Sequence, residues 1–287
     1  MPKKRLSYFM QDFLKYAEST YAQNNVELYE RYLRRFKNYV GDIFLDHVTI
    51  ADIDKFKALR LREAKPTTVS IELRTIKSAF QHAVRWKLMS SNPCDGSKLP
   101  RIPDQAPSFI LHDEMQTLLT ALPARDQWFK DIVLFALLMG LRRSELCNLK
   151  WSNIDMNRRI LTIESSDGFH VKAGKRRTIP IGETAYSILV NRFSLFPEGY
   201  VFKYNGQPVN PLTLTHKFKV AARKAGLDDR IHFHSLRHSC ASWLAADGVS
   251  IYHIAKLLGH TTVSTTEKFY AHLQPESLRE TVNRIAV

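Results

Sequence analysis

Four side chains in two short segments have the types and spacing of a phosphate site. Arg142 and Glu145 stand three residues apart in M-G-L-R-R-S-E-L, and His234 and Arg237 stand three apart in H-S-L-R-H. If each segment is helical, both pairs share a helical face. A guanidinium can hold a phosphate through two hydrogen bonds, and an imidazole can exchange protons near neutral pH. The segments indicate a phosphate clamp with a proton-transfer group, although a surface Arg–Glu pair would also explain the first.

Two further segments add cations and a nucleophile. Lys172 and Lys175 flank an expected tight turn in V-K-A-G-K-R-R-T-I-P-I, where a hairpin tip could hold one lysine over a reacting phosphate. His260 follows the helix-ending Gly259 in L-G-H, and Tyr270 lies ten residues further on. A phenol, with an ordinary pKa of about 10, becomes a good nucleophile only when cationic neighbours stabilise its anion. Taken singly, the lysines could also be a basic turn and the tyrosine a packing residue.

The histidines around Arg237 raise the alternative of a metal site. His234 and His238 are four residues apart, a spacing that binds zinc on helices, and His232 lies nearby. The usual H-E-x-x-H pattern places a glutamate after the first histidine, but that position is Ser235 here. No nearby carboxylate supplies a third ligand. We therefore predict no metal and no cofactor. His238 is expected to lie behind the phosphate site or to be a hydrogen-bonded histidine of the core.

A mostly helical second half must position these segments. Three β-branched runs, separated by D-G and A-G turn signals, predict a small three-stranded meander over 160–163, 169–171 and 178–181. Apolar residues at helical spacing surround it. They predict helices over 112–122, 128–140, 212–225, 235–246, 251–258 and 265–271, and a tail helix over 276–285 after Pro275.

The first half predicts a separate helical domain. Thr49 with Asp52 resembles a capping box that opens its third helix. The fourth helix would carry Arg74, Lys77 and Arg85 on one face, a stripe that suits phosphate contact, though a solvated helix face would look the same. Four prolines then fall between 93 and 107, so we expect a linker over 93–108 between domains at 1–92 and 109–287. The other predicted helices cover 6–22 and 26–40, and the fourth runs from 67 or 68 to about 89.

Composition and charge narrow the class of protein. The chain has 287 residues, with 42 Lys and Arg against 28 Asp and Glu, and a formal net charge of +14. This excess is equal in 1–107 and 108–287, which indicates a polyanion such as DNA held by both domains. A hydrophobic content of 44% excludes a mainly disordered chain, and no apolar run is long enough to cross a bilayer. Three widely spaced cysteines exclude a disulfide framework and fit a reducing cytoplasm.

Together, these segments resemble the tyrosine recombinase, or phage integrase, family. The order R…K…H-x-x-R…H…Y is present over about 109–273, with G-L-R-x-S-E-L, H-S-L-R-H, L-G-H and Y-A-H-L in place. Residues 7–90 resemble the family's helical, SAM-like core-binding domain by pattern. The resemblance implies a mainly α fold with a small three-stranded antiparallel sheet, in two domains. The layout is similar to the compact Xer-type enzymes, without the arm-binding domain of lambda-like integrases.

The resemblance implies a reaction and the groups that perform it. Arg142 and Arg237 would clamp the scissile phosphate of DNA. Tyr270 would attack it and leave a 3′-phosphotyrosyl enzyme with a free 5′ hydroxyl. Lys172, with Lys175 as the alternative, would protonate the leaving oxygen. Two guanidiniums and an imidazole would stabilise the transition-state charge without a metal, and the phosphotyrosine would keep the bond energy, so rejoining needs no ATP.

Supporting roles follow from the same resemblance. His234 would move a proton at the tyrosine, and His260 would bond a non-bridging phosphate oxygen. Glu145 would support the clamp, and His238 would lie behind the site. The positions expected to bind DNA are Arg74, Lys77, Arg85, Lys175, Arg176 and Arg177.

The function implied is site-specific recombination through a Holliday junction. The expected partners are double-stranded DNA sites, four copies of the chain on two sites, and an accessory or directionality factor, with no membrane. Such an enzyme would be cytoplasmic and associated with the nucleoid. Three other classes compete: a catalytically inactive DNA-binding regulator of the same fold, a metal hydrolase using the histidines, and a type IB topoisomerase.

Overall fold

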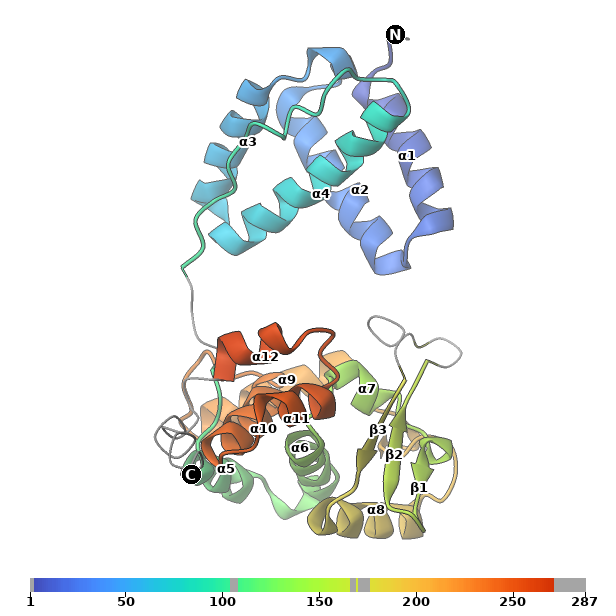
Figure 1. Cartoon of the computed structure of the whole chain (residues 1–287), viewed down its shortest axis with the longest axis vertical. Helices are drawn as coiled ribbons and strands as arrows, with labels where there is room; N and C mark the ends of the chain where they lie inside the picture. The colour runs from blue at the N-terminus through green and yellow to red at the C-terminus, as the bar shows by residue number, and fades with distance from the viewer. Residues whose placement is uncertain (1–2, 104–107, 166–168, 170–175, 271–287) are drawn as a thin grey trace, which may run out of the picture. The chain divides into compact units, whose positions relative to one another are not determined.

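The chain folds into two compact units, Met1–Asp104 and Gln105–Val287, which are described separately below. The computed structural model describes residues 3–103, 108–165, 169 and 176–270 (Figure 1). The expected turn with Lys172 and Lys175 and the expected tail helix over 276–285 lie outside the described residues.

The first unit is a four-helix domain around an aromatic core. Phe36 and Phe80 meet edge to face, with ring centroids 5.7 Å apart, and Phe9 and Phe13 stack at 5.7 Å. Its helices are α1 (Leu6–Thr20), α2 (Gln23–Val40), α3 (Ile50–Glu63) and α4 (Pro66–Arg85), with a 3-10 turn η1 (Leu45–His47).

Local signals set where two of these helices begin. The predicted capping box at α3 is confirmed, because the Thr49 amide donates to Asp52 Oδ2 at 2.9 Å and the Asp52 amide donates to Thr49 Oγ1 at 3.3 Å. Helix α4 begins at Pro66, whose missing N–H and fixed φ suit the first turn.

The beginning of the proline-rich segment packs on the helical unit. Cys94 is buried in its core. Ser97 donates to Asp54 Oδ1 at 2.7 Å, and Lys57 donates to the carbonyl oxygen of Lys98 at 3.0 Å. The proline-rich stretch therefore contributes to the packing of α3 before the chain leaves this unit.

The second unit places helices around a central apolar helix, α6. Phe129, Ile132, Phe135 and Ala136 of α6 are all buried, and α10 packs beside it. The apolar run of this helix thus belongs to the core, and among the described helices none has the length and apolarity needed to cross a membrane. The helices are α5 (His112–Ala121), α6 (Gln127–Met139), α7 (Arg143–Cys147), α8 (Glu183–Leu195), α9 (Pro211–Lys224), α10 (Ser235–Ala246), α11 (Ile251–Leu258) and α12 (Val263–Tyr270), with 3-10 turns η2 (Ala124–Asp126) and η3 (Trp151–Asn153).

A three-stranded antiparallel sheet lies at one side of this unit, in the order β1 (Ile154–Asp155), β2 (Ile160–Ile163), β3 (Arg177–Pro180). The mainly α fold with a small three-stranded sheet is confirmed. The sheet includes one strand that we did not predict, β1, whereas of the predicted strand 169–171 only Phe169 lies within the described residues. Strand β1 has only two residues, which follow the polar W-S-N turn, and two residues are too few to show the apolar–polar alternation of a strand.

Two other elements of the second unit carried no signal that we recognised. Helix α8 leaves Val190, Phe193 and Leu195 exposed, so its apolar residues do not form a single stripe. The hairpin of β4 (Lys203–Tyr204) and β5 (Gln207–Pro208) has only two residues in each strand.

Candidate active site

Two helix C-termini meet at the predicted phosphate site. Helix α6 ends at Gly140, with φ +57°, and α11 ends at Gly259, with φ +67°. Both glycines adopt the left-handed conformation that ends helices. A Cβ atom at Gly140 would lie 2.7 Å from Leu258 Cδ2, so the end of α11 packs closely on this glycine and a larger residue would displace the Leu258 side chain.

The two predicted arginines are held by the carbonyl groups at these helix ends. Arg237 donates to the carbonyl oxygen of Gly140 at 2.7 Å and to that of Leu258 at 2.6 Å. Arg142 donates to the carbonyl oxygen of Gly259 at 3.2 Å. Carbonyls at a helix C-terminus lack intrahelical partners and carry partial negative charge. They therefore orient both guanidiniums, and the structure brings together the arginines of the two sequence segments.

Glu145 lies beneath Arg142 and bonds a second arginine as well. The Arg142 amide donates to Glu145 Oε2 at 2.9 Å and its guanidinium to Oε1 at 2.8 Å. Arg177 donates to both carboxylate oxygens, at 2.9 and 2.7 Å. Burial alone would raise the pKa of Glu145, but the hydrogen bonds and charges of Arg177 and Arg142 outweigh it and hold the pKa at about 2. Glu145 is therefore a permanent anion.

Positive charge is concentrated around Arg237. Burial, followed by repulsion from Arg142, lowers the pKa of Arg237 to about 9. Burial and the charge of Arg237 also lower the pKa of His234 and of His260, each to about 4. The guanidiniums are thus charged and both imidazoles neutral at pH 7, an arrangement that a bound anion would stabilise.

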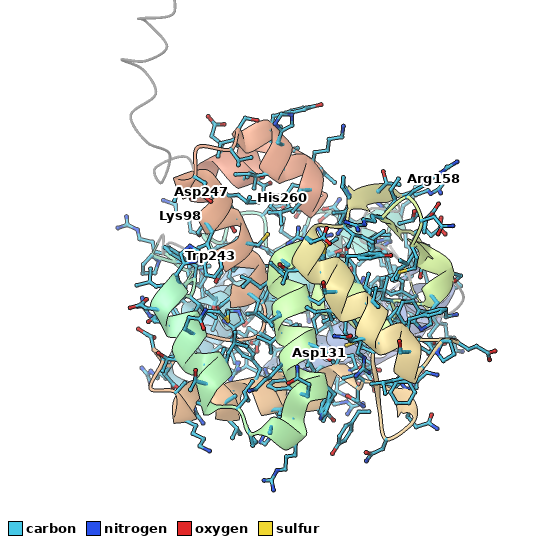
Figure 2. The ribbon with its side chains drawn as sticks, turned by 90° about the horizontal axis from the view of Figure 1, so that it is seen from below. Lys98, Asp131, Arg158, Trp243, Asp247 and His260 are labelled. Carbon is cyan, nitrogen blue, oxygen red and sulfur yellow. The ribbon has the colours of Figure 1, made fainter. Side chains whose placement is uncertain are left out.

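His260 is fixed by the helix that follows it. Its Nδ1 lies 2.7 Å from Thr266 Oγ1 of α12, and its backbone amide donates to the carbonyl oxygen of Ala255 (Figure 2 labels His260). Because Nδ1 is occupied by this contact, Nε2 is the nitrogen left to meet a ligand.

Tyr270 is buried at the end of α12, with 2% of its surface exposed. Its hydroxyl lies 2.5 Å from Nδ1 of His238, and burial raises its pKa to about 12. The pKa of His238 is lowered to about 4, mainly by burial and then by His234. We expected His234 at the tyrosine and His238 behind the site. The structure instead places His238 against the hydroxyl, with the His234 ring 5.0 Å from the His238 ring. Both histidines share one helical face, so their spacing alone could not separate them.

A cavity of about 450 Å³ opens beside Arg142 and His234. It is also lined by Arg143, Ser144 and Thr215, which sequence reasoning missed. Arg143 donates to Thr215 of α9 across it. The one sequence signal for Arg143 is that it directly follows Arg142.

The predicted DNA-binding residues fall into two groups. Arg74, Lys77 and Arg85 are exposed along α4, with Lys77 paired to Asp95 at 2.9 Å. Lys172 and Lys175 fall outside the described residues, as stated above.

Two of these neighbouring residues lie in different environments. Arg176 is exposed, whereas Arg177 is nearly buried against Glu145. A signal existed: Arg177 and the buried Ile179 are two apart on β3, so strand alternation puts them on one face.

The histidine cluster does not assemble as a chelating group. His232 Nδ1 lies 2.9 Å from the carbonyl oxygen of Arg230 and 3.2 Å from Ser235 Oγ. Over the described part of the chain, no three His, Cys, Asp or Glu side chains are grouped to hold a metal ion.

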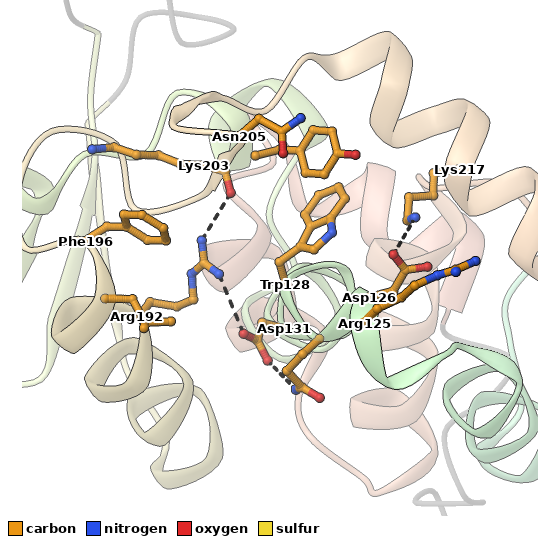
Figure 3. A pocket seen from close by; sticks show the side chains of 12 residues that line it. Arg125, Asp126, Trp128, Asp131, Arg192, Phe196, Lys203, Asn205 and Lys217 are labelled. Atoms are coloured by element: carbon orange, nitrogen blue, oxygen red, sulfur yellow. Dashed lines mark hydrogen bonds and ion pairs between the residues drawn. The ribbon is translucent and has the colours of Figure 1, made fainter.

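A larger cavity, of about 650 Å³, lies elsewhere, at the N-terminal end of α6 (Figure 3). It is lined by Trp128, Arg192 and Lys217 among others, and Lys217 pairs with Asp126 there at 2.8 Å. The arginine site occupies the opposite end of α6, so this cavity is separate from it.

Comparisons with known proteins agree with this architecture. Residues 108–277 match the phage integrase family, and residues 5–99 match the phage integrase SAM-like domain. The chain is 29% identical over 273 residues to a tyrosine recombinase of Thermosipho africanus, covering 92% of this chain and 94% of that protein. It is 31% identical over 249 residues to tyrosine recombinase XerD of Proteus mirabilis, covering 81% of this chain and 76% of that protein.

Solved structures share the fold. A lambda integrase tetramer bound to a Holliday junction matches with a TM-score of 0.82 at 20% identity, over 96% of this chain and 80% of that one. The Tn1549 transposon integrase in complex with transposon right end DNA matches with a TM-score of 0.82 at 21% identity, over 99% of this chain and 100% of that one. With the family match covering more than half of its length, this chain belongs to the phage integrase family.

Proposed function

We propose that this protein is a site-specific DNA recombinase that cuts and rejoins strands through a covalent phosphotyrosine. The observation that carries the proposal is the convergence on one site of two guanidiniums oriented by helix ends, two neutral imidazoles, and a tyrosine hydroxyl 2.5 Å from a third imidazole. Binding alone would not require a nucleophile beside a proton acceptor. The alternative of an inactive DNA-binding regulator is therefore less favoured.

The arginines act on the phosphate. A phosphodiester carries one negative charge, and more develops on its non-bridging oxygens in the transition state. Arg142 and Arg237 stabilise this charge from fixed positions, which needs no reorganisation during the reaction. His260, neutral and accepting at Nδ1 from the Thr266 hydroxyl, donates its Nε2–H to a non-bridging oxygen.

His238 acts on the nucleophile. With a pKa of about 12, the Tyr270 hydroxyl is protonated at pH 7 and attacks only as its proton leaves. Neutral Nδ1 of His238 accepts that proton as the tyrosine oxygen bonds to phosphorus and the bond from phosphorus to the 5′ oxygen breaks. Lys172, by resemblance to the family, gives a proton to the leaving 5′ oxygen. We propose that His234 supports this transfer through His238 and does not contact the hydroxyl.

The proposed substrate is double-stranded recombination-site DNA. The lambda integrase and Tn1549 integrase structures are complexes with DNA, and one is a tetramer on a Holliday junction. By this likeness, four copies of our chain would act on two sites, at the nucleoid in the cytoplasm. An accessory or directionality factor remains part of the proposal.

The proposal is tested with a nicked DNA substrate that loses its 5′ fragment after cleavage, which traps the covalent intermediate. The protein should form an adduct with DNA that survives SDS, at the same rate with and without EDTA. Failure to form an adduct on a substrate that the protein binds would favour the inactive regulator. Loss of the reaction in EDTA would favour the metal hydrolase.

The assignment of Lys172 has its own test. Lys172→Ala should slow cleavage of ordinary DNA, while a bridging 5′-phosphorothiolate, whose leaving group needs no proton, should restore the rate. Equal defects on both substrates would assign Lys172 to binding and leave Lys175 as the acid.

A further inference from the structure

Two adjacent arginines at the start of β3 have different environments. The Arg176 side chain is 69% exposed and pairs with Glu164 at 3.2 Å. The Arg177 side chain is 11% exposed, and both of its terminal nitrogens bond Glu145. The two side chains have the same chemistry, so any difference between their roles comes from position. This pair provides a matched comparison.

Arg177 contacts both groups that hold Arg142. The first is Glu145, which accepts from the backbone amide and the guanidinium of Arg142. The second is Gly259, whose carbonyl oxygen accepts from Arg142. A Cβ atom at Gly259 would lie 2.7 Å from Arg177 Cδ and 2.9 Å from its Nε, so the Arg177 side chain lies directly against this residue. Displacing Arg177 would therefore release both supports of Arg142.

Arg177 also sets the charge that a phosphate meets. Glu145 with Arg142 alone would form a neutral pair, and its carboxylate would compete with the phosphate for the guanidinium. With Arg177 bonded to both carboxylate oxygens, the group of three carries one net positive charge. Bidentate pairing of this kind is stronger and more directional than a single contact. The second arginine thus leaves the charge of Arg142 available to the substrate.

The position of Arg177 in the sequence also relates it to the proposed acid, Lys172. Arg177 pairs with Ile163 of β2 and is the first residue of β3. Lys172, the proposed acid, lies five residues earlier in the sequence. The ion pair between Arg177 and Glu145 therefore attaches β3, the strand that follows Lys172 in the sequence, to the same carboxylate that positions Arg142.

We infer that Arg177 is a positioning residue for cleavage, acting through Glu145 and Gly259 on Arg142, and not a DNA contact. This inference rests on the proposed function. It predicts that Arg177 influences the rate of the chemical step at saturating DNA, whereas Arg176 influences only affinity for DNA.

The experiment compares Arg177→Met with Arg176→Met in single-turnover cleavage of the nicked substrate at saturating concentration, with DNA affinity measured separately. Arg177→Met should lower the saturated rate by at least about tenfold, as loss of a ligand-orienting partner does at metal centres. Its affinity for DNA should stay near that of the wild type. Arg176→Met should instead lower affinity for DNA, and its saturated rate should change much less than that of Arg177→Met. A fall in affinity alone for Arg177→Met would overturn the inference and restore the DNA-contact role.

A double-mutant cycle separates positioning from general structural damage. In a Glu145→Gln background, Arg177→Met should add much less than its effect on the wild type, because the carboxylate that links it to Arg142 is gone. Additive effects would overturn the proposed route. As pH is lowered, cleavage by Arg177→Met should also fall at a higher pH than cleavage by the wild type, because Glu145 loses its main stabilising partner and becomes protonated more easily.

A lysine variant covers the case in which Arg177→Met does not fold. Arg177→Lys keeps the charge but cannot make two parallel hydrogen bonds, so the saturated rate should still fall several-fold. A wild-type rate for Arg177→Lys would contradict bidentate positioning. An absence of adduct with the wild-type protein is a different result, since it would contradict the proposed function itself.

Discussion

Each domain buries a glutamate between two arginines, and the two clusters differ in what surrounds them. In the helical domain, Glu72 accepts from Arg60 at 2.9 and 3.0 Å and from Arg35. In the second domain, Glu145 accepts from Arg177 at 2.9 and 2.7 Å and from Arg142. Each glutamate thus accepts two hydrogen bonds from one arginine, from Nε and Nη2 of Arg60 at Glu72 and from Nη1 and Nη2 of Arg177 at Glu145. The pairs alone therefore do not distinguish a structural cluster from a catalytic one.

The two clusters differ in the residues that surround them. The Glu72 cluster joins α2, α3 and α4, and its outer member, Arg35, extends to the surface. The Glu145 cluster lies beside Arg237, His234 and His260, whose pKa values are all lowered by burial and then by neighbouring cations. Groups with strongly shifted pKa values tend to collect at functional sites. We propose that Glu72 stabilises its domain, whereas Glu145 holds an anion-binding site in position.

The largest expected effect comes from removing Arg237, the buried cation that lies beside the second cluster. Arg237→Ala should lower saturated cleavage by about 100-fold or more, as loss of a transition-state donor does. Its melting temperature should change by only a few degrees, because burial of this guanidinium is itself unfavourable. Single-turnover cleavage and thermal melting measure the two effects. A large drop in melting temperature with normal cleavage would make Arg237 structural, like Arg60.

Parallel glutamine substitutions test the comparison itself. Glu72→Gln should destabilise the protein by about 3 kcal/mol, the low end for breaking a buried ion pair, since Arg60 and Arg35 lose this buried carboxylate and Arg60 keeps only the exposed Glu63. Its saturated cleavage rate should match the wild type at a temperature where both are folded. Glu145→Gln should lower that rate by at least about tenfold. If both variants slow cleavage equally, the distinction between the clusters is wrong.

A smaller effect is expected from pH. His234, His238 and His260 have pKa values of about 4, below their ordinary 6.5, so they are neutral at pH 7. A lowered folded-state pKa means that stability is complete above about 6.5 and is lost as pH falls toward 4. Melting temperature should therefore drop between pH 7 and pH 5, and cleavage should fall as pH approaches 4, where His238 becomes protonated and can no longer accept a proton. A flat melting profile would contradict the buried, neutral state of these histidines.

Much of the site could be predicted because its residues recur at helical spacing. Arg142 with Glu145, and His234 with Arg237, were identified by i, i+3 separations, and α10 has its predicted bounds of Ser235–Ala246. The choice between His234 and His238 at the tyrosine could not be predicted. It depends on how α12 packs against α10, and both histidines share the face that α12 meets.

The burial of Arg177 went unpredicted for a related reason. In the run K-R-R, the three residues at 175–177 look alike by charge, and only the register of β3 against β2 decides which one turns inward. The pairing of Arg177 with Ile163, and its spacing from Ile179, place it on the inner face. Strand β1 and helix α8 were missed because neither shows a single apolar period, one being too short and the other apolar on more than one side.

The most direct test of the central claim is to locate the covalent bond. Adduct trapped on the nicked substrate can be digested with protease and nuclease, and the nucleotide-bearing peptide identified by mass spectrometry. We predict a nucleotide on Tyr270, formed by the wild-type protein and absent from Tyr270→Phe, which should still bind DNA because it loses one hydroxyl from an interface made mainly by Lys and Arg. A nucleotide on any other residue, or an adduct that persists in Tyr270→Phe, would show that Tyr270 is not the nucleophile.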